Sequence, residues 1–180
     1  MQYSEKMNRR STWLAMVLGL ILFMPIVGCT QTSGIESTSY RLMLHTLLSH
    51  DVPEITVAAA SQAEDKAVFL DAREPAEFNV SHIAGAIPVG YDQFDLSALA
   101  GIPKDQQIIV YCSVGYRSEK VSEQLLAAGY QRVANLYGGI FEWKNQGHPV
   151  VNPAGEPTDE IHAYNRTWGM WLKKGATKVY

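Results

Sequence analysis

Three short apolar segments in the middle of the chain place the strongest constraint on its fold. Residues 67–71 and 107–111 are mostly Val, Ile, Leu and Phe between polar neighbours, and residues 132–136 repeat the pattern more weakly. Short apolar runs of this kind are typical of strands that are buried on both faces of a sheet. The runs therefore predict a compact α/β domain.

The segment between the last two strands predicts how they are connected. Residues 118–128 place Val121, Leu125 and Ala128 on one helical stripe, and Gly129 follows as a C-terminal cap. A strand, a helix and a second strand in this order pair in parallel through a right-handed crossover. We therefore expect a parallel central sheet.

The loop between strand 107–111 and this helix holds the strongest candidate for chemistry. Cys112 follows the strand directly, and the functional groups of open α/β sheets gather at the carboxyl ends of the strands. The loop N–H groups, the positive end of the helix and Arg117 all favour a thiolate at this position. Gly115 permits the tight curvature. The alternative is a buried cysteine that packs as a small hydrophobic residue.

Three ordered motifs and a closing segment resemble the rhodanese sulfurtransferase family. They are Leu70–Phe78 (LDAREPAEF), His82–Pro88 (HIAGAIP), Tyr111–Ser118 (YCSVGYRS), and the pair Gly138–Trp143 (GGIFEW) and Gly147–Val150 (GHPV). The resemblance covers approximately residues 53–151. The combination is highly specific, whereas one piece alone, such as Asp-x-Arg, is weak.

The resemblance implies both a fold and a reaction. The fold is a rhodanese-like α/β fold, a five-stranded parallel sheet flanked by helices on both faces. The protein is then an enzyme, a sulfurtransferase that moves a sulfane sulfur from thiosulfate or a persulfide donor to a thiol or cyanide-like acceptor through a Cys112 persulfide. No cofactor is expected.

The resemblance also assigns roles to residues of the loop. Cys112 is the sulfur carrier, and the persulfide-binding loop consists of Ser113, Val114, Gly115, Tyr116 and Arg117. Arg117 steers an anionic donor, holds the loop by pairing with an acid, or does both.

The resemblance also implies structural roles for four residues outside the loop. Asp71 and Arg73 match an ion pair that supports the active-site loop near the carboxyl end of the sheet. His82 matches a turn that precedes a strand, so a structural histidine is expected there rather than a general base. Trp143 matches a packing residue.

The number of residues between Cys112 and Arg117 distinguishes a sulfurtransferase from a phosphatase of similar fold. Phosphatases of similar fold place five residues between the cysteine and the arginine, whereas four lie between Cys112 and Arg117. The shorter loop suits the terminal sulfur of a persulfide. Ser113 and Val114 are neutral, and this puts thiosulfate in doubt as the natural donor. Two alternatives to the enzyme stay open: a non-catalytic binding module built on this fold, and a thiol redox partner that forms mixed disulfides through Cys112.

The N-terminal segment predicts export and a lipid anchor. Basic residues precede an uncharged, apolar run over residues 11–28, which is the pattern of a signal peptide. The run ends at Cys29 in a sequence that resembles the lipobox of bacterial lipoproteins, so residues 1–28 are expected to be removed and Cys29 to carry lipid. The protein is then anchored to the bacterial cell membrane or outer membrane. The alternative, an uncleaved anchor, needs about 20 apolar residues, and Pro25 interrupts the run.

The remaining segments complete the expected domain organisation. Residues 29–39 are rich in Ser, Thr and Gly and predict a flexible tether, and the domain of residues 40–152 starts with a helix over 40–48. Residues 153–180 form an extension with five apolar residues at helical spacing, Ile161, Tyr164, Trp168, Trp171 and Leu172. We expect an amphipathic helix that packs on the domain or on helix 40–48, the alternatives being a face for a protein partner or for the membrane.

Charge and histidine distribution exclude two further classes. The net charge is −3, and no cluster of Lys and Arg is longer than a dipeptide, so nucleic-acid binding is not expected. The five histidines are scattered and only Cys112 remains besides Cys29, so no metal site is expected.

Overall fold

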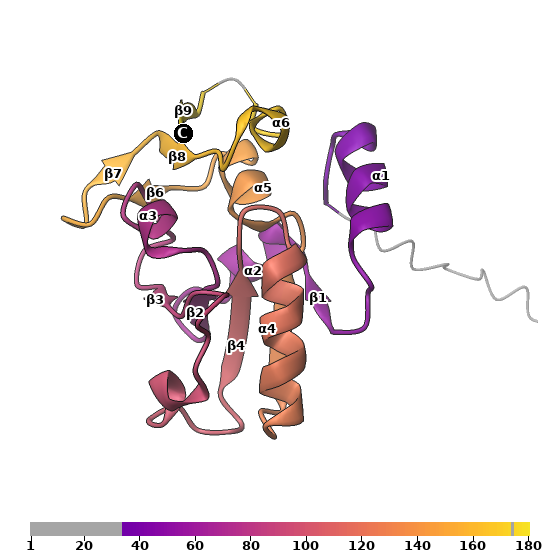
Figure 1. The fold of residues 1–180 in the computed structure, drawn as a ribbon, viewed down its shortest axis with the longest axis vertical. Coiled ribbons are helices and arrows are strands. Elements are labelled where there is room, and N and C mark those ends of the chain that lie inside the picture. Colours follow the sequence, from indigo (N-terminus) through magenta and orange to yellow (C-terminus); the bar gives the residue numbers. More distant parts are fainter. Residues whose placement is uncertain (1–33, 174) are drawn as a thin grey trace, which may run out of the picture. The chain divides into compact units, whose positions relative to one another are not determined.

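The computed structural model describes residues 34–173 and 175–180, and its central sheet has five parallel strands in the order β1-β5-β4-β2-β3 (Figure 1). The strands are β1 (Glu54–Ile55), β2 (Val68–Asp71), β3 (Ile87–Pro88), β4 (Gln107–Tyr111) and β5 (Arg132–Leu136). The three apolar runs identified in the sequence form β2, β4 and β5, and the predicted five-stranded parallel sheet is confirmed. The two edge strands contain only two residues each.

Helices cover both faces of this sheet, because the strands alternate their buried side chains between two cores. On β4, Ile109 and Tyr111 join one core, while Ile108 and Val110 join the other. The first core also includes residues of α1 (Thr38–Leu47), α2 (Val57–Ser61) and α5 (Gly139–Asn145). The second includes residues of η1 (Leu96–Leu99) and α4 (Tyr116–Ala127). The short helix α3 (Pro75–Phe78) follows β2.

Two helix boundaries differ from those predicted. Helix α1 begins at Thr38 because the Ser37 side chain accepts a hydrogen bond from the Tyr40 amide, and Ile35 is already buried in the core. Folded structure therefore starts inside the segment expected to be a tether. Helix α4 begins at Tyr116, directly after Gly115, and Gly129 follows its end with a φ of +89°.

The extension is not the single amphipathic helix that the spacing of its apolar residues predicted. It consists of β7 (Pro157–Thr158), β8 (Glu160–His162), the short helix α6 (Arg166–Gly169) and β9 (Thr177–Val179). Strand β7 pairs with β6 (Val150–Val151), and β8 pairs with β9. Ile161 and Leu172 are buried and Trp168 and Trp171 are partly buried, each from a different part of the extension, whereas Tyr164 is exposed. Tyr164, with a φ of +63°, interrupts any helix between β8 and α6.

The predicted packing of the extension on the domain is confirmed. Trp171 stacks on Tyr40 of α1, with ring centroids 5.1 Å apart and planes 15° from parallel. The Asn145 side chain at the end of α5 donates to the Trp171 carbonyl (3.0 Å) and accepts from the Lys173 amide (2.8 Å). Ile161, Ala163 and Leu172 are buried in the first core, so the extension is an integral part of the folded unit. In Figure 1 it lies across the end of the sheet toward which β4 points.

The predicted signal peptide, Cys29 and the first part of the predicted tether lie outside the described residues. Within residues 34–173 and 175–180, no helix is long and apolar enough to cross a membrane.

Candidate active site

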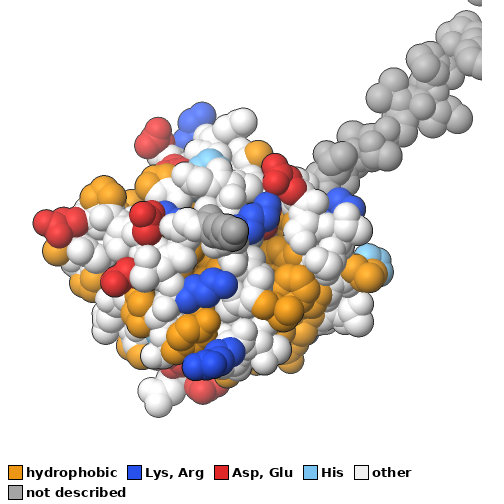
Figure 2. Space-filling view, turned by 90° about the horizontal axis from the view of Figure 1, so that it is seen from above, with side chains coloured by type: hydrophobic (Ala, Val, Ile, Leu, Met, Phe, Trp, Pro, Cys, Tyr) orange, Lys and Arg blue, Asp and Glu red, His pale blue; other side chains and the backbone are white. Residues whose placement is uncertain are grey.

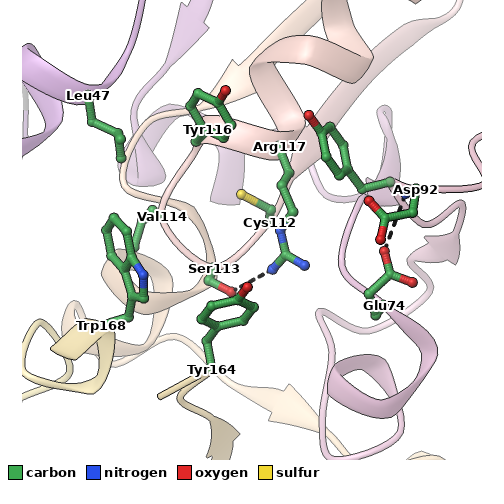
Figure 3. Close-up of a pocket in the computed structure, with 11 residues that line it drawn as sticks. Leu47, Glu74, Asp92, Cys112, Ser113, Val114, Tyr116, Arg117, Tyr164 and Trp168 are labelled. Atoms are coloured by element: carbon green, nitrogen blue, oxygen red, sulfur yellow. Dashed lines mark hydrogen bonds between the residues drawn. The ribbon is translucent and has the colours of Figure 1, made fainter. Parts of the chain in front are cut away.

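Cys112 lies directly after β4, at the carboxyl edge of the sheet, where the chain turns into α4. Its side chain is 1% exposed and lines a cavity of about 400 Å³ (Figure 3). The loop residues Ser113, Val114, Tyr116 and Arg117 line the same cavity, so the structure brings together most of the residues that the sequence analysis assigned to the loop. Gly115 does not line the cavity; its amide faces the sulfur from within the loop.

The backbone of the loop is closed around the sulfur. The Gly115 N–H donates a hydrogen bond to Cys112 Sγ over 3.1 Å. Gly115 has a φ of +124°, a conformation that other residues rarely adopt, and its carbonyl accepts hydrogen bonds from Asn135 Nδ2 (3.0 Å) and Ser118 Oγ (3.1 Å). Asn135 on β5 is fully buried. The loop is therefore held in shape from the neighbouring strand.

The N-terminus of α5 supports the loop from a second side. The Ile140 amide donates to the Cys112 carbonyl (2.9 Å), and the Phe141 amide donates to the Ser113 carbonyl (3.1 Å). This approach needs a glycine at position 139. A Cβ there would overlap the Cys112 carbonyl oxygen and lie 2.7 Å from the Ser113 carbonyl oxygen. The pair Gly138-Gly139 thus brings the N-terminus of α5 against the active-site loop.

Arg117 is held by an acid that the sequence analysis left unassigned. Its Nη1 donates to Glu77 Oε2 (2.6 Å) and its Nη2 to Glu77 Oε1 (2.8 Å). Ser113 Oγ donates to the same carboxylate (3.0 Å), and Arg117 Nη2 also donates to Ser113 Oγ (3.0 Å). Of the two predicted roles of Arg117, this geometry directly provides the pairing that holds the loop.

The carboxylate of Glu77 remains ionised in this position. Burial acts to raise the pKa of Glu77, but the hydrogen bonds and charge of Arg117, with the charge of Arg73 and the Glu74 amide, outweigh burial and lower the pKa. Glu77 lies at the third position of α3 and accepts from the Glu74 amide (3.2 Å). The sequence signal that points to this position is a glutamate three residues after the N-cap Glu74, in a helix whose first residue is Pro75.

Asp71 and Arg73 form a fully buried ion pair, although it does not bond to the Cys112 loop. Arg73 Nη2 donates to Asp71 Oδ2 and to the Ser81 carbonyl, both over 2.6 Å. The guanidinium also lies over the Tyr111 ring, 5.7 Å from its centroid. Ser81 in turn donates its hydroxyl to the Glu160 carbonyl of the extension. The pair thus connects the end of β2 to the turn before β3 and to the extension.

The other two residues with expected structural roles, His82 and Trp143, do not line the cavity. The His82 ring stacks on Phe78, with centroids 3.8 Å apart, and its Nδ1 is 3.1 Å from the Phe78 carbonyl oxygen. Trp143 is fully buried and donates its indole N–H to the Pro149 carbonyl (2.9 Å).

The outer wall of the cavity comes from residues that the sequence analysis did not place near Cys112. Leu47 belongs to α1, Tyr164 follows β8, and Trp168 belongs to α6. Glu74, Tyr91 and Asp92 line the cavity elsewhere. In Figure 3, Leu47 and Trp168 lie on one side of the Cys112 sulfur, and Glu74 and Asp92 lie on the opposite side. No sequence motif links Leu47, Tyr164 and Trp168 to Cys112, since they meet it only through the packing of α1 and the extension.

No cluster of three or more His, Cys, Asp or Glu side chains suited to a metal ion occurs in the part of the chain that the structure describes. Cys112 is the free thiol of this part.

Comparison with known proteins places this site in a family context. The profile of the rhodanese-like domain matches residues 55–146. A protein named sulfurtransferase from Allochromatium vinosum is 37% identical over 107 residues, which cover 58% of this chain and 99% of that protein. The tRNA uridine(34) hydroxylase of Cronobacter sakazakii is 33% identical over 117 residues, which cover 58% of this chain and 34% of the hydroxylase. The chain therefore spans about a third of that second relative.

Solved structures agree with the sequence comparison. The rhodanese-like domain of a protein from Anabaena superposes with a TM-score of 0.52 at 25% identity, covering 56% of this chain and 79% of that domain. Both α1 and the extension, which supply Leu47, Tyr164 and Trp168, lie outside the residues that the family profile matches.

The Glu77–Arg117 pair predicts a pH-dependent stability. Replacing Glu77 by Gln should lower the free energy of unfolding at pH 7 by about 2 to 4 kcal/mol, because it leaves a largely buried arginine without its anion. A group with a lowered pKa in the folded state stabilises fully above its unfolded-state pKa, about 4.3 for Glu, and this stabilisation is lost as the pH falls through the folded-state value. The difference between the wild type and E77Q, measured by urea unfolding, should therefore shrink below about pH 4.

The matched control for this experiment is Glu123→Gln. Glu123 pairs with Lys120 on the surface of α4 (2.6 Å), so its loss should cost less than about 1 kcal/mol. A difference between the wild type and E77Q that is the same from pH 7 to pH 3 would contradict the lowered pKa of Glu77.

The close approach of α5 predicts that Gly139→Ala is far more damaging than another glycine replacement. Gly147 also has a positive φ, +83°, but a Cβ there meets nothing within 4 Å. Both variants carry the conformational cost of a left-handed alanine, and only G139A adds an overlap with the active-site loop. We expect G139A to lower the free energy of unfolding by about 1 to 3 kcal/mol more than G147A in the same urea titration. Equal losses would argue against tight contact between α5 and the loop.

Proposed function

The chain belongs to the rhodanese-like domain family, and we propose that it is a sulfurtransferase whose Cys112 carries the transferred sulfur as a persulfide. The observation that carries the proposal is the hydrogen bond from the Gly115 amide to Cys112 Sγ, at the base of a cavity and at the N-terminus of the twelve-residue helix α4. An N–H donor and a positive helix end favour negative charge on sulfur. A cysteine that served only as a core residue needs neither a cavity nor an N–H directed at its sulfur.

The proposed reaction moves one sulfur atom in two displacements. In the first, the Cys112 thiolate attacks the outer sulfur of a donor R–S–SH, the new S–S bond forms on Cys112, and RS⁻ leaves with the electrons of the broken bond. In the second, an acceptor thiolate R′S⁻ attacks the outer sulfur of the Cys112 persulfide. This releases R′–S–SH and returns the Cys112 thiolate. Charge and atoms balance in each step, and no external oxidant or reductant is required.

The loop supports this cycle by holding the Gly115 N–H in a fixed position against the sulfur. The hydrogen bonds that hold the carbonyl groups of Cys112, Ser113 and Gly115 leave the amide of Gly115 directed at the sulfur. Because these groups are in place before a substrate enters, no reorganisation opposes charge on the persulfide. Arg117 contributes mainly by holding the loop in place, since Glu77 balances its charge.

Loading of sulfur on Cys112 is directly measurable by mass. The full chain, purified in detergent and treated with thiosulfate or glutathione persulfide, should gain the mass of one sulfur atom, and cyanide should remove it as thiocyanate. Cys112→Ser should show neither change. A Cys112 that reacts with iodoacetamide but gains sulfur from neither donor would overturn the proposal. It would favour a binding module or, if complexes are trapped through mixed disulfides, a redox partner.

We further propose that the protein works at a membrane surface to which Cys29 is attached by lipid. Support comes from the basic start, the apolar run and the lipobox-like end of residues 1–29. Expression in a bacterium with radiolabelled palmitate should label the wild type and the Cys112→Ser variant but not Cys29→Ser. Label that persists in Cys29→Ser would contradict the anchor.

A further inference from the structure

One wall of the cavity, the aromatic wall formed by Leu47, Tyr164 and Trp168, comes from segments outside the match to the rhodanese-like domain. The matched part supplies the thiol and the loop, whereas Leu47, Tyr164 and Trp168 come from α1 and the extension. The residues that line the cavity include four aromatic side chains, Tyr91, Tyr116, Tyr164 and Trp168, and the aliphatic side chains of Leu47 and Val114. In Figure 3, Tyr116, Tyr164 and Trp168 lie around the Cys112 sulfur. Seen from the extension side, apolar side chains gather on this face of the molecule (Figure 2).

The two residues of the extension whose aromatic rings line the cavity, Tyr164 and Trp168, are held in defined positions. Tyr164 has a φ of +63°, a costly conformation for this residue type, and its amide donates to His162 Nδ1 (3.1 Å). Its ring is 54% exposed and lies 5.5 Å from the Arg117 guanidinium carbon. Trp168 is positioned by the Asn165 side chain, which caps α6 by accepting from the Trp168 amide (3.1 Å). A strained backbone that directs an exposed aromatic ring toward the active-site arginine is consistent with a binding role rather than with core packing.

The charges that line the cavity do not suit a small dianion such as thiosulfate. Among the lining residues Arg117 is the cation, and Glu77 neutralises it through two hydrogen bonds. Glu74 and Asp92 place carboxylates on the side opposite Trp168. An anion that enters the cavity therefore gains little from Arg117 and is repelled by two acids.

The size of the cavity also favours an organic ligand over thiosulfate. At about 400 Å³ it falls within the range of pockets that bind organic molecules, which are lined mostly by apolar and aromatic side chains with few polar groups. Thiosulfate fills only a small part of such a volume and makes no use of an aromatic wall.

We infer that the physiological sulfur donor or acceptor is an organic thiol or hydropersulfide with an aromatic or other apolar body and no negative charge beside its sulfur, and that Tyr164 and Trp168 bind this body. The inference rests on the proposed function, because it concerns the substrate of the same Cys112. It assigns specificity to the extension and leaves the two displacements at sulfur unchanged.

The test compares two acceptors for one sulfur. The full chain is loaded with inorganic polysulfide, loading is verified by intact mass, and the rates at which benzyl mercaptan and 3-mercaptopropionate remove the sulfur are measured in single turnovers. The ratio of the two rates is the readout, and partial loss of folded protein cancels in it. The wild type should favour the aromatic thiol, and Trp168→Ala should lower the ratio about 3- to 10-fold, the effect of losing one aromatic contact.

A second variant tests whether the effect of Trp168→Ala comes only from misfolding of the extension. Tyr164→Asn removes an exposed ring and places a residue that tolerates a positive φ, so it should keep the fold and still lower the ratio. Met170→Ala is the matched control: Met170 is 65% exposed in the same extension and does not line the cavity, so the ratio should not change.

The outcomes separate this inference from the proposed function. If Cys112 loads and the two acceptors react with ratios that are the same in the wild type, W168A and Y164N, the aromatic wall selects nothing and the inference is overturned while sulfur transfer stands. If no reagent loads Cys112, sulfur transfer itself fails and the substrate inference falls with it.

Discussion

The bidentate ion pair between Arg117 and Glu77 is the interaction on which the geometry around Cys112 depends. Glu77 enters from α3, which follows β2, and Arg117 from the first turn of α4, which follows β4. The pair therefore joins two strand-to-helix connections at one edge of the sheet, and Ser113 closes it with a third hydrogen bond. The Gly115 N–H donates to the Cys112 sulfur, and Glu77 balances the charge of the arginine that closes the same loop. This suits a site where charge moves between sulfur atoms during each transfer.

The packing of α5 against the same loop explains why sulfur chemistry and fold stability are connected here. The carbonyl groups of Cys112 and Ser113 accept from the first amides of α5, and the absence of a side chain at Gly139 allows this approach. Helix α5 also carries Trp143, which is buried in the first core, and Asn145, which binds the extension. A change on α5 therefore reaches both the reactive loop and the wall of the cavity.

Features formed by residues close together in the sequence were predictable, and features formed by residues far apart in the sequence were not. Strands β2 and β4 were predictable because each is a largely buried apolar run. Strand β5, with exposed Arg132 and half-buried Ala134, gave the weaker signal, and β1 and β3, with two residues each, carry no periodic signal. Cys112 and its loop were predictable because they are contiguous. Glu77 was missed as the partner of Arg117, since the two lie 40 residues apart and only the three-dimensional fold brings them together. The extension was predicted as one helix because burial of residues in β8, α6 and the following turn imitates a helical period.

The extension also determines what kind of selectivity the cavity can have. Trp168 packs partly against the first core, and Trp171, three residues later, stacks on Tyr40, so the wall that carries Trp168 is fixed to α1. Leu47 of the same helix completes the wall. A wall that is ordered before binding loses little conformational entropy when a ligand packs on it, and this favours a rigid aromatic or apolar group over a flexible chain. Tyr164 is the exposed member of this wall, so it is the position at which the preference for the body of the substrate can change with the least effect on folding.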